Sequence, residues 1–250
     1  MMVGEQMMVG EQMMQLSTQA SLLRPPHAGP PIPHAASLAD QPHNAVSALE
    51  ELGTVITVAK NAEIWAQGDN VQYSYRIVSG CIRLVKLMED GRRQISEFLV
   101  AGDWLGFDGT AIQDVAAEAV AGSVLKRYKR CAVDALASRD NSVAHWRFEL
   151  MSQKLYLAQE HMLTLGRRTA GERIAAFLLD MEARTGRDRS GTVPLPMNRS
   201  DIGDYLGLRL ETICRVLSRL KRAGAIRTSS TGFSIRDRAA LEVCASETLH

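Results

Sequence analysis

The spacing of the hydrophobic residues changes once along this chain, near residue 140, and the change limits the folds that the chain can adopt. Between Leu52 and about Arg130, short apolar and β-branched runs such as Val55-Ile56-Thr57-Val58 are separated by turn residues. Glycines recur there at positions 68, 80, 91 and 102, and Glu89-Asp90-Gly91 has the composition of a hairpin tip. Short strands with a turn roughly every 8–12 residues are typical of an antiparallel sandwich or barrel. We therefore expect a β domain over residues 46–140.

After Asn141 the apolar residues follow a heptad pattern, which predicts a helix over residues 141–166. The heptad positions are Phe148, Met151, Leu155, Ala158, Met162 and Leu165. This face of the helix could pack on its own domain, or it could pair with its twin in a homodimer. The length of the pattern alone does not decide between the two.

Residues 170–226 predict three further helices, the last two in a helix-turn-helix arrangement. The first runs from Thr169 to Met181. Asn198 is a good N-cap for the second, and Asp201 is placed to complete a capping-box-like arrangement. Gly207 suits the left-handed residue that ends a helix. The third helix, within residues 211–221, has a predicted buried face of Ile213, Val216, Leu217 and Leu220. Residues 226–235 then read as a small hairpin, or wing.

The other face of the third helix carries polar side chains at spacings that project from one side. They are Glu211, Cys214, Arg215, Ser218 and Arg219. Arginine can donate two hydrogen bonds to guanine, and glutamate can accept one from cytosine, so the pattern is typical of a helix in the major groove. Glu211 and Arg215 could equally form an i,i+4 salt bridge on a solvated helix.

Charge is distributed unevenly along the chain. The net charge is +1, but residues 166–238 carry 15 basic and 8 acidic residues, a net of +7, and the remainder has a net charge of −6. A basic segment joined to an acidic body is typical of a nucleic-acid reader, although a merely solvated charged surface would look the same.

The run DIGDYLGLRLETICRVLSRLKRAGAI, from Asp201 to Ile226, resembles the DNA-binding segment of the Crp/Fnr superfamily of bacterial transcription regulators. The resemblance extends over residues ~50–240. It implies an α+β chain with an antiparallel β-roll of the cyclic-nucleotide-binding jelly-roll type, a long dimerisation helix (residues 141–166) and a winged helix-turn-helix (residues 167–250).

The resemblance also implies the partners and the site. Members of the Fnr-like branch bind a TTGAT-N4-ATCAA-like palindrome as homodimers and activate transcription with RNA polymerase. The implied base contacts here are Glu211, Cys214 and Arg215. The implied phosphate contacts are Asn198, Arg209, Arg219, Lys221 and Arg222.

Several departures from the family pattern argue against particular subgroups of the superfamily. Residues 1–80 contain no cysteine, which argues against the iron–sulfur cluster of Fnr itself. No arginine is placed to bind a cyclic phosphate, and Asp114 and Glu118 would repel one. We expect His145 and His161 to be surface residues rather than haem ligands. No cofactor is expected. A sequence without these features resembles the FixK-like subgroup. That resemblance implies control of microaerobic respiration, denitrification or nitrogen-fixation genes.

Cys214 admits two interpretations. It can be a small residue tolerated beside the bases. Alternatively, Arg209, Arg215 and Arg219 favour its thiolate, and oxidation would place a negative charge against the DNA, which makes Cys214 a candidate redox switch.

Residues 1–45, which are Pro-rich between residues 24 and 34, are expected to be a disordered tail.

Other classes of protein have less support. No apolar run is long enough to cross a bilayer, and no signal peptide or zinc-binding cysteine pattern is present, so a cytoplasmic protein is expected. The Ser-x-x-Lys pattern at Ser218 has no companion motif, so an enzyme is not expected. The basic C-terminal segment argues against a binding module without DNA function. A regulator gated by a small molecule in the β-roll remains the main alternative.

Overall fold

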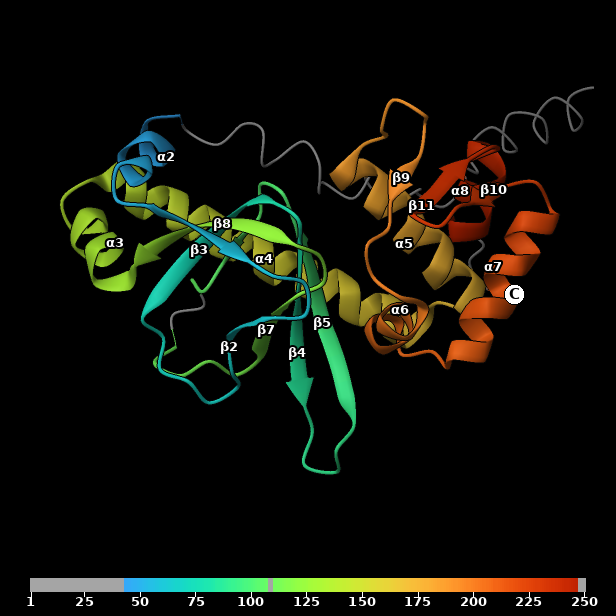
Figure 1. Ribbon diagram of the computed structural model, residues 1–250, viewed down its shortest axis with the longest axis horizontal. Helices are drawn as coiled ribbons and strands as arrows, with labels where there is room; N and C mark the ends of the chain where they lie inside the picture. Colours follow the sequence, from blue (N-terminus) through green and yellow to red (C-terminus); the bar gives the residue numbers. More distant parts are fainter. Residues whose placement is uncertain (1–42, 108–109, 247–250) are drawn as a thin grey trace, which may run out of the picture. The chain divides into compact units, whose positions relative to one another are not determined.

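The computed structural model describes residues 43–107 and 110–246 (Figure 1). Residues 1–42 of the predicted tail lie outside this range. The tail prediction extends too far at its C-terminal end, because helix α2 (His43–Glu50) already begins at residue 43.

The N-terminal part of the described chain is built from two four-stranded antiparallel sheets, which confirms the predicted β-roll. One sheet has the order β1-β8-β3-β6 and the other β2-β7-β4-β5. The strands are β1 (Thr54–Val58), β2 (Glu63–Trp65), β3 (Tyr73–Ser79), β4 (Cys81–Leu87), β5 (Arg93–Val100), β6 (Trp104–Leu105), β7 (Ala116–Ala119) and β8 (Ser123–Lys129). Strands β4 and β5 form a hairpin whose tip has Gly91 at φ 81°, as the Glu-Asp-Gly turn predicts.

A hydrophobic core fills the space between the two sheets. Ile77 on β3 and Leu125 on β8 face Ile82 on β4 and Leu99 on β5, and all four side chains are buried. Ile77 and Leu125 alternate with more exposed residues along β3 and β8, as expected when that sheet buries one face. On β4 and β5 the neighbours Cys81, Phe98 and Val100 are buried as well, so this sheet is covered on both faces.

An aromatic cluster lies at one end of the β-roll, where α2, α3 (Arg130–Ala137) and α4 (Asn141–Arg167) meet the sheet. The ring of Trp104 lies 4.8 Å from that of Trp146 and 5.4 Å from that of Tyr128, measured between centroids. Neither α2 nor α3 is apparent from the sequence, because an eight-residue helix is too short to show a helical period.

Helix α4 is capped by Asp140, whose side chain accepts a hydrogen bond from the Ser142 backbone N–H at 2.8 Å. Its first half packs on the aromatic cluster through Val143, Trp146 and Leu150. No residue of the helix after Leu150 is fully buried in the described chain.

The C-terminal part contains the predicted helix-turn-helix and wing. Its elements are α5 (Ala170–Thr185), β9 (Val193–Pro194), α6 (Arg199–Leu206), α7 (Leu210–Arg222), β10 (Ile226–Thr228), β11 (Gly232–Ile235) and α8 (Arg238–Ser246). The wing hairpin β10–β11 gains a third strand from β9. None of the helices in the described residues is long and apolar enough to span a membrane.

A single hydrophobic cluster joins the β-roll to the helices that follow. Ile95 and Phe98 on β5 belong to the same cluster as Phe177 on α5 and Ile202 on α6. The Phe98 ring lies 5.3 Å from the ring of Tyr205 on α6. Figure 1 shows α6 beside β5 accordingly. The β-roll therefore offers a packing surface to the helix-turn-helix.

Candidate nucleic-acid interface

The turn between α6 and α7 is tight because two glycines allow it. Gly207 ends α6 in the left-handed conformation, at φ 63° and ψ 38°. Gly203 lies so close to the next segment that a Cβ there would come within 2.6 Å of the Leu208 carbonyl oxygen. At the other end of α6, the Asn198 side chain accepts a hydrogen bond from the Asp201 N–H at 2.8 Å, so the predicted N-cap is confirmed.

Helix α7 buries the four apolar residues that its sequence predicts, Ile213, Val216, Leu217 and Leu220. Its opposite face is polar: Glu211, Arg215, Ser218 and Arg219 are exposed and Cys214 is half-buried. The alternative ion pair between Glu211 and Arg215 is not formed, and neither side chain takes part in an ion pair within the described residues. Both side chains are therefore available to a ligand.

The residues predicted to contact phosphates lie around this polar face. Asn198 is exposed at the start of α6, and Arg209 is exposed at the start of α7. Arg219, Lys221 and Arg222 are exposed in the last turn of α7, where the helix dipole favours positive charge. Arg219 differs from the others in direction. A Cβ on Gly171 would lie 2.7 Å from its Nη2, so its guanidinium lies against the first turn of α5.

The neighbour of the Cys214 thiol is an arginine that the sequence does not indicate. Arg199, in the first turn of α6, has its Nη1 3.3 Å from Cys214 Sγ. The cations that the sequence predicts near this thiol are Arg209, Arg215 and Arg219, and the contact that the structure shows is with Arg199. Arg199 is 15 positions away in sequence and is brought near because α6 and α7 pack against each other. The structure therefore adds Arg199 to the polar surface.

The prediction that His161 is a surface residue is wrong. Its ring stacks on Tyr205, with centroids 4.2 Å apart and an angle of 11° between the planes, and its Nε2 is buried. Burial lowers the pKa of His161. His145, by contrast, is exposed and lies 3.1 Å from Glu149.

Asp201 does not complete a capping box, because its carboxylate is bound by two arginines of the β-roll. Its two oxygens accept hydrogen bonds from Arg83 at 3.0 Å and from Arg93 at 2.7 Å. Arg93 also binds Asp204 at 2.6 Å, and Arg83 binds Glu118 at 2.6 Å. We call these five residues the Asp201 cluster. The arginines lie more than 100 positions from Asp201, and the sequence carries no local signal of their pairing.

The two acidic residues of the β-roll that were expected to repel a cyclic phosphate each have a basic partner. Glu118 pairs with Arg83, and Asp114 pairs with Lys86. No group of three or more His, Cys, Asp or Glu side chains within the described residues is arranged to hold a metal ion.

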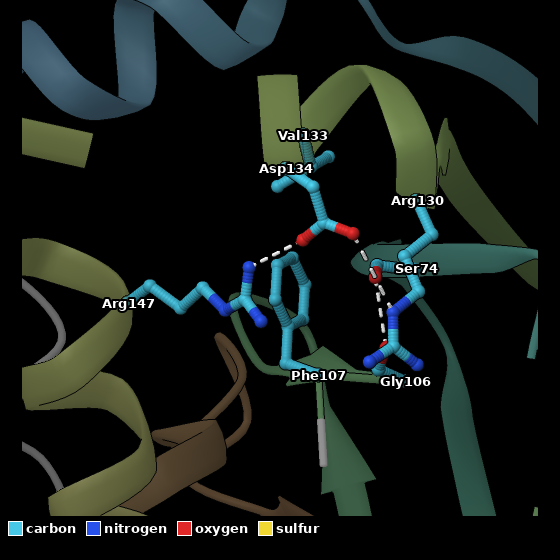
Figure 2. Close-up of a pocket in the computed structure, with 7 residues that line it drawn as sticks. All are labelled: Ser74, Gly106, Phe107, Arg130, Val133, Asp134 and Arg147. Atoms are coloured by element: carbon cyan, nitrogen blue, oxygen red, sulfur yellow. Dashed lines mark hydrogen bonds and ion pairs between the residues drawn. The ribbon is translucent and has the colours of Figure 1, made fainter. Parts of the chain in front are cut away.

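A depression on the β-roll offers little chemistry. Figure 2 shows it between Phe107, Val133 and the polar residues Ser74, Asp134 and Arg147. It encloses no space for a water molecule. Asp134 is held by Arg147 at 2.5 Å, and the Ser74 hydroxyl donates to the Gly106 carbonyl at 2.8 Å, so these polar groups are already paired.

Comparison with known proteins agrees with this architecture. Residues 55–140 match the cyclic nucleotide-binding domain family, and residues 172–244 match the Crp-like helix-turn-helix domain family. The nitrogen fixation regulation protein FixK of Azorhizobium caulinodans is 40% identical over 207 residues, which cover 81% of this chain and 84% of FixK. FixK of Bradyrhizobium diazoefficiens is 35% identical, over 79% of this chain and 84% of that protein.

A solved structure is similar as well. FixK2 from Bradyrhizobium japonicum is 37% identical with a TM-score of 0.74, over 79% of this chain and 99% of FixK2. The two family matches cover the β-roll and the helix-turn-helix, in the order found here. This chain belongs to the Crp/Fnr superfamily of DNA-binding transcription regulators, in its FixK-like branch.

Proposed function

We propose that the protein binds a TTGAT-N4-ATCAA-like palindrome as a homodimer without an added effector. In this proposal it activates genes of microaerobic respiration or nitrogen fixation together with RNA polymerase. The observation that carries the proposal is the polar face of α7, where Glu211 and Arg215 are exposed and unpaired within the described chain. Such a face can lie in a major groove, with arginine on guanine and glutamate on cytosine.

The base contacts that we propose are Glu211, Cys214 and Arg215. They occupy the first two turns of α7, the end of a recognition helix that reaches the bases in helix-turn-helix proteins. Around them, Asn198, Arg209, Arg219, Lys221 and Arg222 are proposed to bind phosphates, which sets the register of the helix on the duplex. The exposure of all five residues supports this role.

The homodimer is proposed to form through α4. Phe148, Leu155 and Met162 are 69%, 62% and 64% exposed, and Met151 and Ala158 are exposed beside them. Leu165, the last residue of the heptad pattern, is half-buried. An apolar stripe of this length on one helix is costly to leave in water, and a second copy of the same stripe would cover it. The two α7 helices would then lie about 34–36 Å apart, one turn of DNA.

Regulation by oxidation is proposed at Cys214. Reaction of its thiolate with two molecules of peroxide would give a sulfinate and two molecules of water. The sulfinate would bring a negative charge to the surface that faces the DNA phosphates, and it would attract the neighbouring guanidinium of Arg199. Both effects would weaken DNA binding.

The experiment that tests the proposal measures binding of purified, reduced protein to a labelled palindrome by fluorescence anisotropy, with a scrambled duplex as the competitor. We expect preferential binding of the palindrome with no small molecule added. Binding that requires a cyclic nucleotide or another effector would favour the alternative of a ligand-gated regulator.

A further inference from the structure

The Asp201 cluster connects the β-roll to the first helix of the helix-turn-helix. Its cations are on β4 (Arg83) and β5 (Arg93), and two of its anions, Asp201 and Asp204, are on α6. Asp201 is only 1% exposed. A buried carboxylate is costly unless it is paired and hydrogen-bonded, and here each of its oxygens has an arginine donor.

A second buried contact links the same two parts of the chain. Arg184 on α5 donates hydrogen bonds to the Asp103 carboxylate and to the Phe98 carbonyl oxygen, each at 2.7 Å. The Arg184 and Asp103 side chains are 12% and 10% exposed. Directed polar contacts thus add to the hydrophobic cluster and define one orientation of α5 and α6 on the β-roll.

The orientation of α6 determines that of α7. The two helices are joined by the three residues from Gly207 to Arg209, and the close approach of Gly203 to Leu208 leaves little freedom in the turn. With the Asp201 cluster formed, the polar face of α7 remains exposed. The contacts to the β-roll therefore use a different surface of the helix-turn-helix from the one proposed to meet DNA.

We infer that Arg93 and Arg83 are positioning residues, which hold α6, and through it α7, in the orientation that binds DNA in the absence of a ligand. This inference rests on the proposed function. It assigns to ion pairs within the chain the orienting role that an effector would otherwise have. Loss of a pair would leave a smaller fraction of molecules competent, and the apparent affinity falls by the same fraction.

Two substitutions of opposite charge separate positioning from simple electrostatics. Arg93→Gln removes a positive charge and Asp204→Asn a negative one, and both break the same pair. We expect each to weaken binding to the palindrome by about tenfold. If only the net charge mattered, Arg93→Gln would weaken binding and Asp204→Asn would strengthen it. Both side chains are partly exposed, 33% and 29%, so the variants are expected to fold.

The same hairpin supplies matched controls. Arg92 and Asp90 form an ion pair with each other, and both are largely exposed, 80% and 52%. Arg92→Gln and Asp90→Asn repeat the two charge changes at this pair, and we expect them to leave the affinity within about twofold of wild type.

Two further variants test whether the effects share one cause. Arg93→Lys keeps the charge but loses the forked geometry of the guanidinium, so it should recover part of the affinity that Arg93→Gln loses. The double variant Arg93→Gln/Asp204→Asn should bind no more weakly than Arg93→Gln alone, because Arg93→Gln already removes the contact with Asp204 together with the contact with Asp201. Thermal unfolding and sedimentation show whether each variant is folded and whether it keeps the oligomeric state of the wild type.

The outcomes distinguish this inference from the proposed function. If wild type does not prefer the palindrome, the proposed function is wrong. If wild type does and the two variants bind as tightly as the controls, or more tightly than wild type, or shift in opposite directions, the positioning role is wrong.

Discussion

The imidazole of His161 lies parallel to the ring of Tyr205, with the centroids 4.2 Å apart, and so joins α4 to α6. Burial is the main cause of the lowered pKa of His161, and the nearby charge of Arg173 lowers it further, while Asp180 acts in the opposite direction. The folded protein therefore holds this histidine in its neutral form at a pH where the unfolded chain already binds a proton.

The stability of the protein should therefore decrease when the pH falls below about 6.5, the ordinary pKa of histidine. The contribution of His161 is fully present above that value and is lost as the pH falls toward the lower pKa of the folded state. His161→Phe keeps an aromatic ring against Tyr205 but cannot be protonated. Urea unfolding between pH 7.5 and 5.5 should show a smaller loss of free energy for this variant. Equal losses in the two proteins would contradict the assignment.

A charge in the middle of the exposed α4 stripe should prevent dimer formation. Leu155→Glu would place a carboxylate between two apolar surfaces, so we expect monomers in sedimentation and loss of tight binding to the palindrome. Val55→Glu is the control, because Val55 is 63% exposed, similar to Leu155, but lies on β1. A monomeric Leu155→Glu protein that still binds the palindrome tightly would rule out the dimer as the binding form.

Arg215→Ala should change which base is preferred, whereas Lys221→Ala should not. Loss of a bidentate contact costs about 1–3 kcal/mol at one base pair of each half-site. Loss of a phosphate contact weakens all sequences alike and reduces the dependence of affinity on salt. Anisotropy titrations on single-base variants of the palindrome, at several salt concentrations, measure both. Equal weakening by Arg215→Ala on specific and random duplexes would exclude a base-reading role.

Peroxide should abolish DNA binding by the wild type and leave DNA binding by Cys214→Ala unchanged. Mobility shifts before and after treatment test this, with mass spectrometry to locate the added oxygens. Cys131→Ala is a useful control, because Cys131 is the more exposed thiol and lies outside the helix-turn-helix. A disulfide between the two Cys214 residues is not expected, since thiols on helices about 34 Å apart cannot meet. If the wild type and Cys214→Ala respond to peroxide in the same way, Cys214 is not the residue whose oxidation controls binding.

Local features of this fold could be predicted from the sequence, and contacts between distant segments could not. The N-cap at Asn198, the left-handed Gly207 and the buried face of α7 each depend on residues a few positions apart, so periodicity and capping chemistry indicate them. The partners of Asp201 depend on how β4 and β5 pack against α6. From the sequence alone, the Asp201 carboxylate is predicted to be part of a helix cap. Only the tertiary fold shows that it binds Arg83 and Arg93 instead.

His161 illustrates the same limit. A histidine in the mostly exposed second half of a long helix is predicted to be a surface residue, and the stacking of its ring on Tyr205 leaves it only half-buried rather than exposed. The contact of Arg199 with Cys214 could have been suspected from the helix-turn-helix motif, because the two helices of that motif pack against each other. The motif as a whole, rather than any residue next to Arg199 in the sequence, indicates that this contact can form.

The hydrophobic cluster shared by β5, α5 and α6 bears on how such regulators can be recombined. A helix-turn-helix cut from this chain would expose the surface that Phe177 and Tyr205 present to Phe98, and the β-roll left behind would expose Phe98. The two halves should therefore unfold in one cooperative transition rather than two. A chimera that takes its helix-turn-helix from a relative would also need the β5 residues of that relative, because these residues pack on α5 and α6. The segment that is exchanged should therefore include β5 rather than start at the end of α4.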